Sequence, residues 1–264
     1  MMEATDPWGS GTAYDRYMGR WSRHVATEFL WWLAVPSGRR WLDVGCGTGV
    51  LTRTILESAA PSEVVGVDQS GDFVAYAAAQ TADPRARFAV ADATDLPSGD
   101  GAFDAVVAGL VLNFVAEPRA ALRELARVTA HGGTIAAYVW DYRDGMQFIR
   151  TFWDAAIALD AAAGSLHQGE RFPLARPDAL AAMFESASLQ DVASRSIEIP
   201  TRFADFDDFW APFLGGTGPA PSYVATLDDE RRTALRERLR VSVPTEPDGS
   251  IPLYARAWAV RGRR

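Results

Sequence analysis

The sequence predicts an α/β fold built on a doubly wound, mostly parallel sheet, and three observations support this prediction. Short apolar runs alternate with segments of helical periodicity from Trp41 to Trp140, which is the pattern of repeated β-α units. Three glycines at alternate positions, Gly45, Gly47 and Gly49, follow the first apolar run. Polar residues, several of them acidic, follow the later runs. Because the carboxyl ends of parallel strands line a ligand crevice in such folds, we expect a ligand at this edge of the sheet.

Length and composition restrict the class of protein. The 264 residues are enough for one large domain or a domain with a lid, and 48% of them are hydrophobic, so a substantial core can form. The net charge of −8 argues against nucleic acid as the main partner, because phosphate binding needs clustered cations. The single cysteine, Cys46, cannot form a disulfide within the chain. There is no apolar leader and no apolar run of about 18 residues, so we expect a cytoplasmic protein without a membrane partner.

The segment 10–36 is predicted to be an N-terminal helical lid that ends at Pro36-Ser-Gly38. Apolar residues recur at three- and four-residue steps from Tyr14 to Trp32, which is the spacing of one helix face packed on a core. A second interpretation concerns Tyr14, Tyr17 and Arg20, which could close over the ligand.

The glycine turn joins a predicted strand, Trp41–Val44, to a predicted helix over 50–56. Such a turn brings backbone N–H groups and a helix N-terminus close to a ligand. A dinucleotide site would need the pattern G-x-G-x-x-G, but Val50 stands where the last glycine should be. Together with Asp43, two residues before the first glycine, the pattern G-x-G-x-G resembles motif I of the class I S-adenosylmethionine (SAM) dependent methyltransferases. An acidic residue suits a ligand that carries an ammonium and a sulfonium group.

Asp68 ends the second predicted strand, 63–68, and lies 19 residues beyond Gly49. An acid at this position of a doubly wound fold accepts hydrogen bonds from ribose hydroxyls, and an ionised carboxylate can accept from both vicinal hydroxyls. The alternative role is a helix N-cap, but Ser70 can cap the next helix and leave Asp68 available. We therefore expect Asp68, with Gln69 beside it, in the cofactor site.

The third predicted strand runs into a loop at the same edge, within residues 87–97. There Asp92 could accept the exocyclic amine of an adenine, and the Ala93 N–H could meet a ring nitrogen. The remaining elements predicted up to Trp140 are a strand over 103–108, a helix over 117–129 capped by His131-Gly-Gly133, and a strand over 134–140.

The second half of the chain is less regular. Within a single domain of residues 1–264, a SAM-binding core over 37–140 is predicted to carry helical additions on the substrate side, over 141–188 and 203–252. Four aromatic residues on one predicted helix of the second addition form either an acceptor pocket or part of the core: Phe206, Phe209, Trp210 and Phe213. The other predictions here are helices over 146–159, 175–187 and 231–240, strands over 189–199 and 253–260, and a flexible Gly/Pro-rich stretch over 215–221.

The whole array resembles a class I SAM-dependent methyltransferase of the small-molecule group that also contains the quinone C-methyltransferases. The resemblance covers residues 10–140 and is specific at 41–49, 64–70, 88–97 and 103–115. It implies a seven-stranded sheet of order 3-2-1-4-5-7-6 with strand 7 antiparallel, SAM as cofactor and S-adenosylhomocysteine (SAH) as product. It also implies a set of contacts: Gly45 and Gly47 with the methionine part, Asp68 with the ribose, Asp92 and Ala93 with the adenine, and Leu110 or Gly109 beside the sulfonium.

Departures from related patterns restrict the methyl acceptor. No Asn/Asp-Pro-Pro-aromatic sequence follows the fourth strand, which disfavours a nucleobase amine as acceptor. No second cysteine is present to attack a pyrimidine ring. No His, Asp or Glu cluster has metal-ligand spacing, so we expect no metal. We predict a small, partly apolar acceptor, while the sequence does not specify an oligomeric state.

Three residues at strand ends are candidates for orienting or deprotonating the acceptor: Asn113, Asp141 and Tyr142. Each is more easily explained as structural than as catalytic, because no triad-like pairing is visible in the sequence. Two other functions stay open. One is a non-catalytic SAM-binding or regulatory protein, which would use the same pocket, and the other is an NAD(P)-dependent oxidoreductase, which Val50 disfavours.

Overall fold

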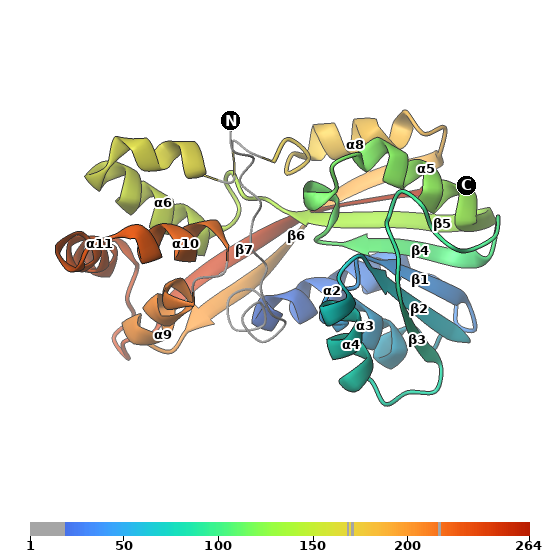
Figure 1. Ribbon diagram of the computed structural model, residues 1–264, viewed down its shortest axis with the longest axis horizontal. Coiled ribbons are helices and arrows are strands. Elements are labelled where there is room, and N and C mark those ends of the chain that lie inside the picture. The colour runs from blue at the N-terminus through green and yellow to red at the C-terminus, as the bar shows by residue number, and fades with distance from the viewer. Residues whose placement is uncertain (1–18, 168, 170–171, 216–217) are drawn as a thin grey trace. The chain divides into compact units, whose positions relative to one another are not determined.

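The computed structural model describes residues 19–167, 169, 172–215 and 218–264. Figure 1 shows its helices and strands with the labels used below. In chain order the elements are α2 (Arg20–Leu33), β1 (Arg40–Val44), α3 (Val50–Ser58), β2 (Glu63–Asp68), α4 (Gly71–Ala79), β3 (Ala86–Val90), β4 (Phe103–Gly109), η2 (Leu112–Phe114), α5 (Pro118–Val128), β5 (Thr129–Trp140), α6 (Gln147–Leu159), η3 (Ala161–Leu166), α8 (Pro177–Glu185), β6 (Gln190–Phe203), α9 (Phe206–Trp210), η4 (Ala211–Leu214), α10 (Pro219–Thr226), α11 (Asp229–Ser242) and β7 (Ile251–Arg263).

The strands form one seven-stranded sheet in the order β3-β2-β1-β4-β5-β7-β6. The pairs β1–β2, β1–β4, β2–β3 and β4–β5 are parallel, whereas β5 and β7 are antiparallel. The predicted α/β fold class, its strand order and its antiparallel strand are therefore confirmed. As a consequence, the carboxyl ends of β1 to β5 share one edge, which is where the sequence predicts the ligand.

The chain forms two compact units. Unit 1 contains Asp141–Phe172 and Glu198–Arg256, and unit 2 contains Trp21–Trp140, Pro173–Ile197 and Ala257–Arg264. The two long strands β6 and β7 supply residues to both units. The predicted helical additions, 141–188 and 203–252, fall mainly in unit 1, but α8 belongs to unit 2.

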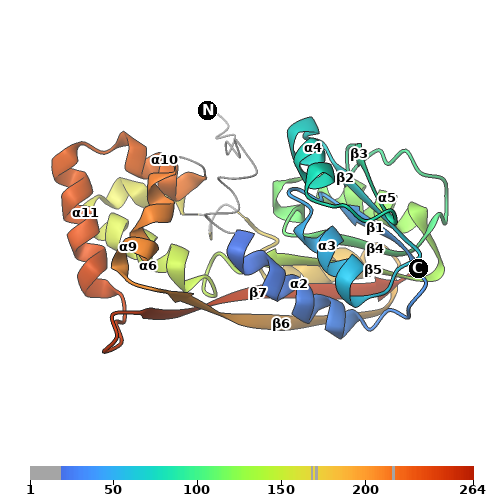
Figure 2. The same ribbon diagram turned by 90° about the horizontal axis from the view of Figure 1, so that it is seen from below.

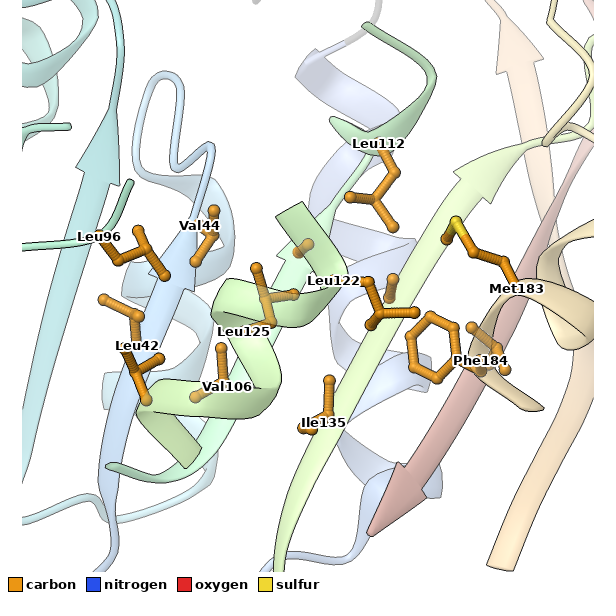
Figure 3. Packing of buried hydrophobic residues seen from close by; sticks show 14 of the residues in the cluster. Leu42, Val44, Leu96, Val106, Leu112, Leu122, Leu125, Ile135, Met183 and Phe184 are labelled. Atoms are coloured by element: carbon orange, nitrogen blue, oxygen red, sulfur yellow. The ribbon is translucent and has the colours of Figure 1, made fainter. Parts of the chain in front are cut away.

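Unit 2 has helices on both faces of its strands. The helices α2, α3 and α4 cover one face, and α5 and α8 cover the other (Figure 1), while Figure 2 views the sheet from the side of α2 and α3. On the second face, Leu122 and Leu125 of α5 and Phe184 of α8 join Val106 and Ile135 in one buried cluster (Figure 3). Each such side chain contributes about 1.5–3 kcal/mol of hydrophobic stabilisation. This cluster keeps β4 and β5 in place beneath the ligand-binding edge.

Unit 1 has an aromatic core. Phe152 and Phe148 of α6 stack on Phe213, with ring centroids 4.4 and 4.5 Å apart. The ring of Phe148 also meets those of Phe203 and Phe209 at 5.1 and 5.3 Å. Four aromatic residues were predicted to form either an acceptor pocket or part of the core. Each of their side chains is at most 8% exposed: Phe206, Phe209, Trp210 and Phe213. They are part of the core of unit 1.

Three predicted boundaries differ from the structure. The predicted helix over 206–213 ends as an α-helix at Trp210, and a 3-10 turn, η4, continues it. The stretch 215–221, predicted to be flexible, contains the start of α10 at Pro219. His131–Gly133 lies within β5 and does not cap α5. Within the described part of the chain, no helix is long and apolar enough to span a lipid bilayer.

Candidate cofactor site

The glycine turn after β1 has the left-handed backbone that only glycine adopts without strain. The φ angles of Gly45, Gly47 and Gly49 are +72°, +52° and +79°. The N–H groups of Gly45 and Cys46 donate to the carbonyl of Val67 at 2.7 and 2.9 Å, which ties the turn to β2. The helix α3 begins directly after Gly49. The turn is therefore held from both sides in the conformation that a ligand-binding loop requires.

Two glycines of the turn have opposite surroundings. A Cβ on Gly45 would lie 2.3 Å from a side-chain carbon of Val111, in the loop after β4. A Cβ on Gly47 would meet nothing within 4 Å. Gly45 therefore allows two loops of unit 2 to touch, whereas Gly47 faces open space that a ligand can enter.

Asp68 joins the glycine turn to the loop after β2. Its Oδ2 accepts a hydrogen bond from the N–H of Gly47 at 3.0 Å, and its Oδ1 accepts one from the N–H of Ser70 at 2.9 Å. The hydroxyl of Ser70 accepts from the N–H of Phe73 at 3.4 Å and caps α4, as predicted. A carboxylate oxygen can accept more than one hydrogen bond, so Asp68 retains capacity for ligand hydroxyls. Gln69, predicted beside it, is exposed at the same edge.

Asp43 is fully buried near the end of β1. The hydroxyl of Thr52, on α3, donates to its Oδ2 at 2.6 Å, while its Oδ1 has no hydrogen-bond partner among the described residues. Burial, and secondarily the charge of Asp68, raise the pKa of Asp43 to about 7, against the lowering effect of the Thr52 hydrogen bond. An unpartnered buried carboxylate oxygen is costly unless a ligand satisfies it.

Thr52 was not among the residues predicted for the site, although it is a polar residue beside the apolar Leu51 and Ile55 of its helix. It is fully buried between them, and a polar side chain at such a position is the signal that was available. Cys46, in the turn, is 6% exposed, and burial raises the pKa of its thiol. The thiol therefore stays protonated, which makes it a poor nucleophile.

The loops after β3 and β4 carry the other predicted cofactor residues. Asp92 is exposed, and its Oδ1 accepts from the N–H and hydroxyl of Thr94 at 2.8 and 2.7 Å, which lowers its pKa. Ala93 follows it and is partly buried. Leu110 has a φ of +60°, and its N–H donates to the carbonyl of Tyr138 at 2.8 Å. A bulky residue in this region of φ is strained, and such strain is concentrated at functional sites.

Asn113 lies in η2, also after β4, and its Oδ1 is buried without a hydrogen-bond partner among the described residues. It is thus available to orient a ligand, as predicted. Asp43, Gly45, Gly47, Asp68, Gln69, Asp92, Ala93, Leu110 and Asn113 all belong to unit 2 and to the loops or ends of its parallel strands.

The remaining predicted residues belong to unit 1 or lie outside the described residues. Asp141 is 3% exposed, and its Oδ2 accepts from the guanidinium of Arg256 at 2.6 and 2.8 Å. This buried ion pair explains Asp141 as a structural residue, because the guanidinium of Arg256 occupies its Oδ2. Tyr142 is buried, with its ring 5.3 Å from that of Phe172.

Arg20, predicted to act in a lid, pairs with Asp208 at 2.9 Å, and its guanidinium lies 4.5 Å from the ring centroid of Phe203. Tyr14 lies outside the described residues, so the lid remains a prediction. No group of three His, Cys, Asp or Glu side chains that could hold a metal ion occurs in the described ranges.

These features define the class of ligand. Two carboxylates, Asp43 and Asp68, interact electrostatically with each other, and neither forms an ion pair with a described cation. A cationic ligand with hydroxyl groups would satisfy both, and the open space at Gly47 would admit it. SAM, which carries an ammonium, a sulfonium and a ribose, fits these residues. The strand order of the sheet is that of the class I methyltransferase fold.

Comparison with known proteins finds a family model that matches part of the chain. Residues 42–137 match the model of the family described as "Methyltransferase domain". The matched range runs from within β1 into β5 and includes the loops between them, and the match supports SAM as the cofactor and SAH as the product.

The chain is also similar to curated relatives. It is 39% identical over 131 residues to a demethylmenaquinone methyltransferase of Clavibacter sepedonicus, covering 47% of this chain and 52% of the relative. It is 38% identical over 103 residues to a demethylmenaquinone methyltransferase of Roseiflexus castenholzii, covering 39% of this chain and 43% of the relative. The chain thus spans about half the length of the curated relatives it matches.

Two solved structures share the fold at low sequence identity. The YcgJ protein of Bacillus subtilis has a TM-score of 0.56 at 19% identity, covering 91% of this chain and 99% of that one. Phosphoethanolamine N-methyltransferase 2 of Haemonchus contortus, solved with SAM, has a TM-score of 0.59 at 15% identity, covering 96% of this chain and 57% of that one. At these identities the likeness supports the fold alone.

Proposed function

We propose that the protein is an active SAM-dependent methyltransferase that transfers the methyl group of SAM to a small-molecule acceptor. The observation that carries this proposal is the buried Asp43 carboxylate with one unpartnered oxygen, beside a second carboxylate and an open glycine turn. A turn without a ligand would not need a buried acid with an unsatisfied oxygen. The match of residues 42–137 to the methyltransferase domain family supports the same proposal.

The residues of unit 2 would bind and orient the cofactor. Asp43 Oδ1 would accept from an ammonium group, Asp68 from ribose hydroxyls, and the bare backbone at Gly47 would allow close approach. SAM supplies a methyl group that is already activated on its sulfonium. The protein therefore acts mainly by alignment, which can contribute about 7–11 kcal/mol to lowering the barrier.

The acceptor is proposed to be small and partly apolar. The curated relatives are demethylmenaquinone methyltransferases, which favours an acceptor with an apolar ring system. Asn113 is the candidate for orienting it, because its side-chain oxygen is buried and unpartnered in the described structure. Asp141 is a weaker candidate, since Arg256 already neutralises it.

Titration calorimetry with SAM, SAH and NAD(P) tests the cofactor, and incubation of the protein with labelled SAM and a metabolite extract tests transfer. We expect SAM and SAH to bind, NAD(P) not to bind, and label to appear in a small molecule. Binding of NAD(P) without SAM would identify an oxidoreductase. Binding of SAM with no labelled product from extracts and quinone precursors would favour a regulatory SAM-binding protein.

A further inference from the structure

We propose that Thr52 is a positioning residue for Asp43: its hydroxyl holds one carboxylate oxygen, turns the other toward the cofactor's ammonium, and thereby sets the pH range in which SAM and SAH bind. This inference rests on the proposed function, because it takes the ligand to be SAM or SAH. Thr52 would touch neither the methyl group nor the acceptor, and so would act only through Asp43.

The contact between Thr52 and Asp43 is built by three elements of unit 2. Thr52 is in the first turn of α3, directly after the glycine turn, and its Oγ1 lies 2.6 Å from Asp43 Oδ2. Both side chains are fully buried. On the neighbouring strand β2, Gly66 is paired with Asp43, and a Cβ on Gly66 would lie 3.1 Å from the Thr52 hydroxyl. The missing side chain at Gly66 leaves room for the hydroxyl.

The hydrogen bond also fixes which oxygen is available. Because the Thr52 hydroxyl donates to Oδ2, the carboxylate cannot rotate without losing that bond. Oδ1 then remains as the oxygen without a described partner. A buried hydrogen bond to a charged group is among the stronger ones in proteins. Thr52 therefore prepares Asp43 for a cationic ligand before that ligand arrives.

The groups that face Asp43 make its ionisation sensitive to both Thr52 and the ligand. Asp68 approaches from β2 and Cys46 from the glycine turn, and β4 places the apolar Val107 opposite. On α3, Arg53 donates to the carbonyl of Thr48 and forms no ion pair with Asp43. Burial and Asp68 raise the pKa of Asp43 to about 7, and the Thr52 hydrogen bond opposes them. Near neutral pH, a bound ammonium would therefore draw a proton off Asp43.

The test is titration calorimetry with SAH between pH 5.5 and 8.5, in buffer pairs of different ionisation enthalpy so that released protons are counted. For the wild-type protein, we expect the Kd to weaken up to about tenfold per pH unit below pH 7 and a proton to be released on binding near pH 6. Thr52→Val removes the hydroxyl at similar volume. It should raise the midpoint of this profile by about one pH unit or more, so that the loss of affinity relative to the wild type is largest at the acid end, about tenfold, and shrinks toward pH 8.5.

Two further variants separate positioning from structure. Thr52→Ser retains the hydroxyl and should restore the wild-type profile. Thr54→Val is the matched control, because Thr54 is a buried threonine of the same helix whose hydroxyl donates at 2.8 Å to the carbonyl of Val50. It should leave the profile unchanged. The ratio of each variant's Kd to that of the wild type cancels the titration of the ligand's own amino group.

Three results would overturn the inference. The first is a ratio of the Thr52→Val Kd to the wild-type Kd that is the same at every pH. The second is the absence of proton release by the wild type near pH 6. The third is a pH profile of the Thr52→Ser Kd that matches that of Thr52→Val. If Thr52→Val does not fold, Thr52→Ala is titrated in its place. The number of protons that the wild type releases on binding SAH tests the inference without any variant. Failure of the wild type to bind either SAM or SAH would instead overturn the proposed function.

Discussion

At the scale of single residues, the site depends on two carboxyl groups in different surroundings. Asp68 accepts hydrogen bonds from two backbone N–H groups at 2.9 and 3.0 Å, whereas Asp43 accepts one from Thr52 and keeps one oxygen unsatisfied. Both acids were predicted from their places at strand ends. The Thr52 contact and the strained φ of Leu110 were not, because each depends on which atoms meet after folding.

The raised pKa of Asp43 predicts how stability depends on pH. Its native pKa of about 7 lies above the usual value of 3.8, so the folded protein binds more protons than the unfolded chain between about pH 4 and 7. The free energy of unfolding should therefore fall as pH rises through this window, by about 2–3 kcal/mol between pH 5 and 8 without ligand. Urea denaturation at several pH values measures this, with Asp43→Asn as the variant that cannot titrate. An equal pH dependence in both proteins would contradict the assignment.

Asp68→Ala should weaken SAH binding by about 1.5–3 kcal/mol, which is about 10- to 150-fold in Kd, because hydrogen bonds to a charged group are lost. The protein should still fold, since Asp68 is at a strand end and partly exposed. Asp72→Ala, which removes an exposed acid in the first turn of α4, is the control for net charge. A Kd within threefold of the wild type would exclude Asp68 from the site.

Gly45→Ala and Gly47→Ala should fail in different ways. The new Cβ at position 45 would lie 2.3 Å from Val111, so this variant should lose substantial stability. The Cβ at position 47 meets nothing within 4 Å, so this variant should lose stability mainly because alanine is strained at a φ of +52°. Its Cβ should weaken binding because it occupies the space of the ligand. Thermal denaturation and SAH calorimetry on both variants measure this contrast. Normal SAH affinity in Gly47→Ala would show that the ligand does not lie there.

At the scale of elements, the apolar runs predicted β1 to β5 well because each contains an apolar segment between clear breaks. The starts of β4 and β5 show what the pattern could not reveal. Gly132 and Gly133 do interrupt the chain, but they form an irregularity inside β5, where a Cβ on Gly133 would lie 2.8 Å from the carbonyl oxygen of Ala130. The helix before them ends earlier, where the Thr129 hydroxyl donates to the carbonyl of Leu125 at 2.6 Å.

The break between α9 and η4 has a simpler cause. Pro212 has no N–H to donate to the carbonyl of Asp208, and its ring would crowd that carbonyl in an α-helix. The aromatic periodicity over 206–213 continues through the break, which is why the sequence predicted one helix. In the same way, Pro219 sits at the first position of α10, where a missing N–H costs nothing.

The aromatic core of unit 1 leads to a prediction for Trp210. This side chain is 6% exposed, and its ring centroid lies 5.9 Å from that of Phe213. Trp210→Ala should lower the free energy of unfolding by about 3–5 kcal/mol, because it leaves a cavity in a packed cluster. Leu214→Ala, at a neighbouring position that is 58% exposed, should cost less than about 0.5 kcal/mol. A stable Trp210→Ala protein with a raised KM for its acceptor would instead favour the pocket interpretation.

At the scale of the whole molecule, the methyltransferase domain match and the cofactor residues predicted at the strand ends fall within unit 2. Unit 1 holds the helices for which the sequence predicts a substrate role, and the match to the family ends before it at residue 137. Composition could not separate the units, because no linker divides them and β6 and β7 belong to both. The placement of α8 in unit 2 follows from Leu180, Met183 and Phe184, which pack in the sheet cluster.

Hydrogen exchange should map the ligand onto one edge of unit 2. If SAH binds as proposed, amides of the four loops at the carboxyl ends of the strands should be protected: 45–49, 68–70, 92–94 and 109–113. Some of their N–H groups are held by a residue that is proposed to bind the ligand, such as those of Gly47 and Ser70 by Asp68. The opposite edge, where a hollow of about 210 Å³ is lined by residues including Arg39, His131 and Arg263, serves as an internal control and should exchange unchanged. Exchange measured by mass spectrometry at SAH concentrations above the Kd makes this comparison within one sample. Protection confined to the opposite edge, or spread evenly over unit 2, would show that the carboxyl-end loops are not where SAH binds, whereas protection of the four loops alone would place the cofactor at the strand ends.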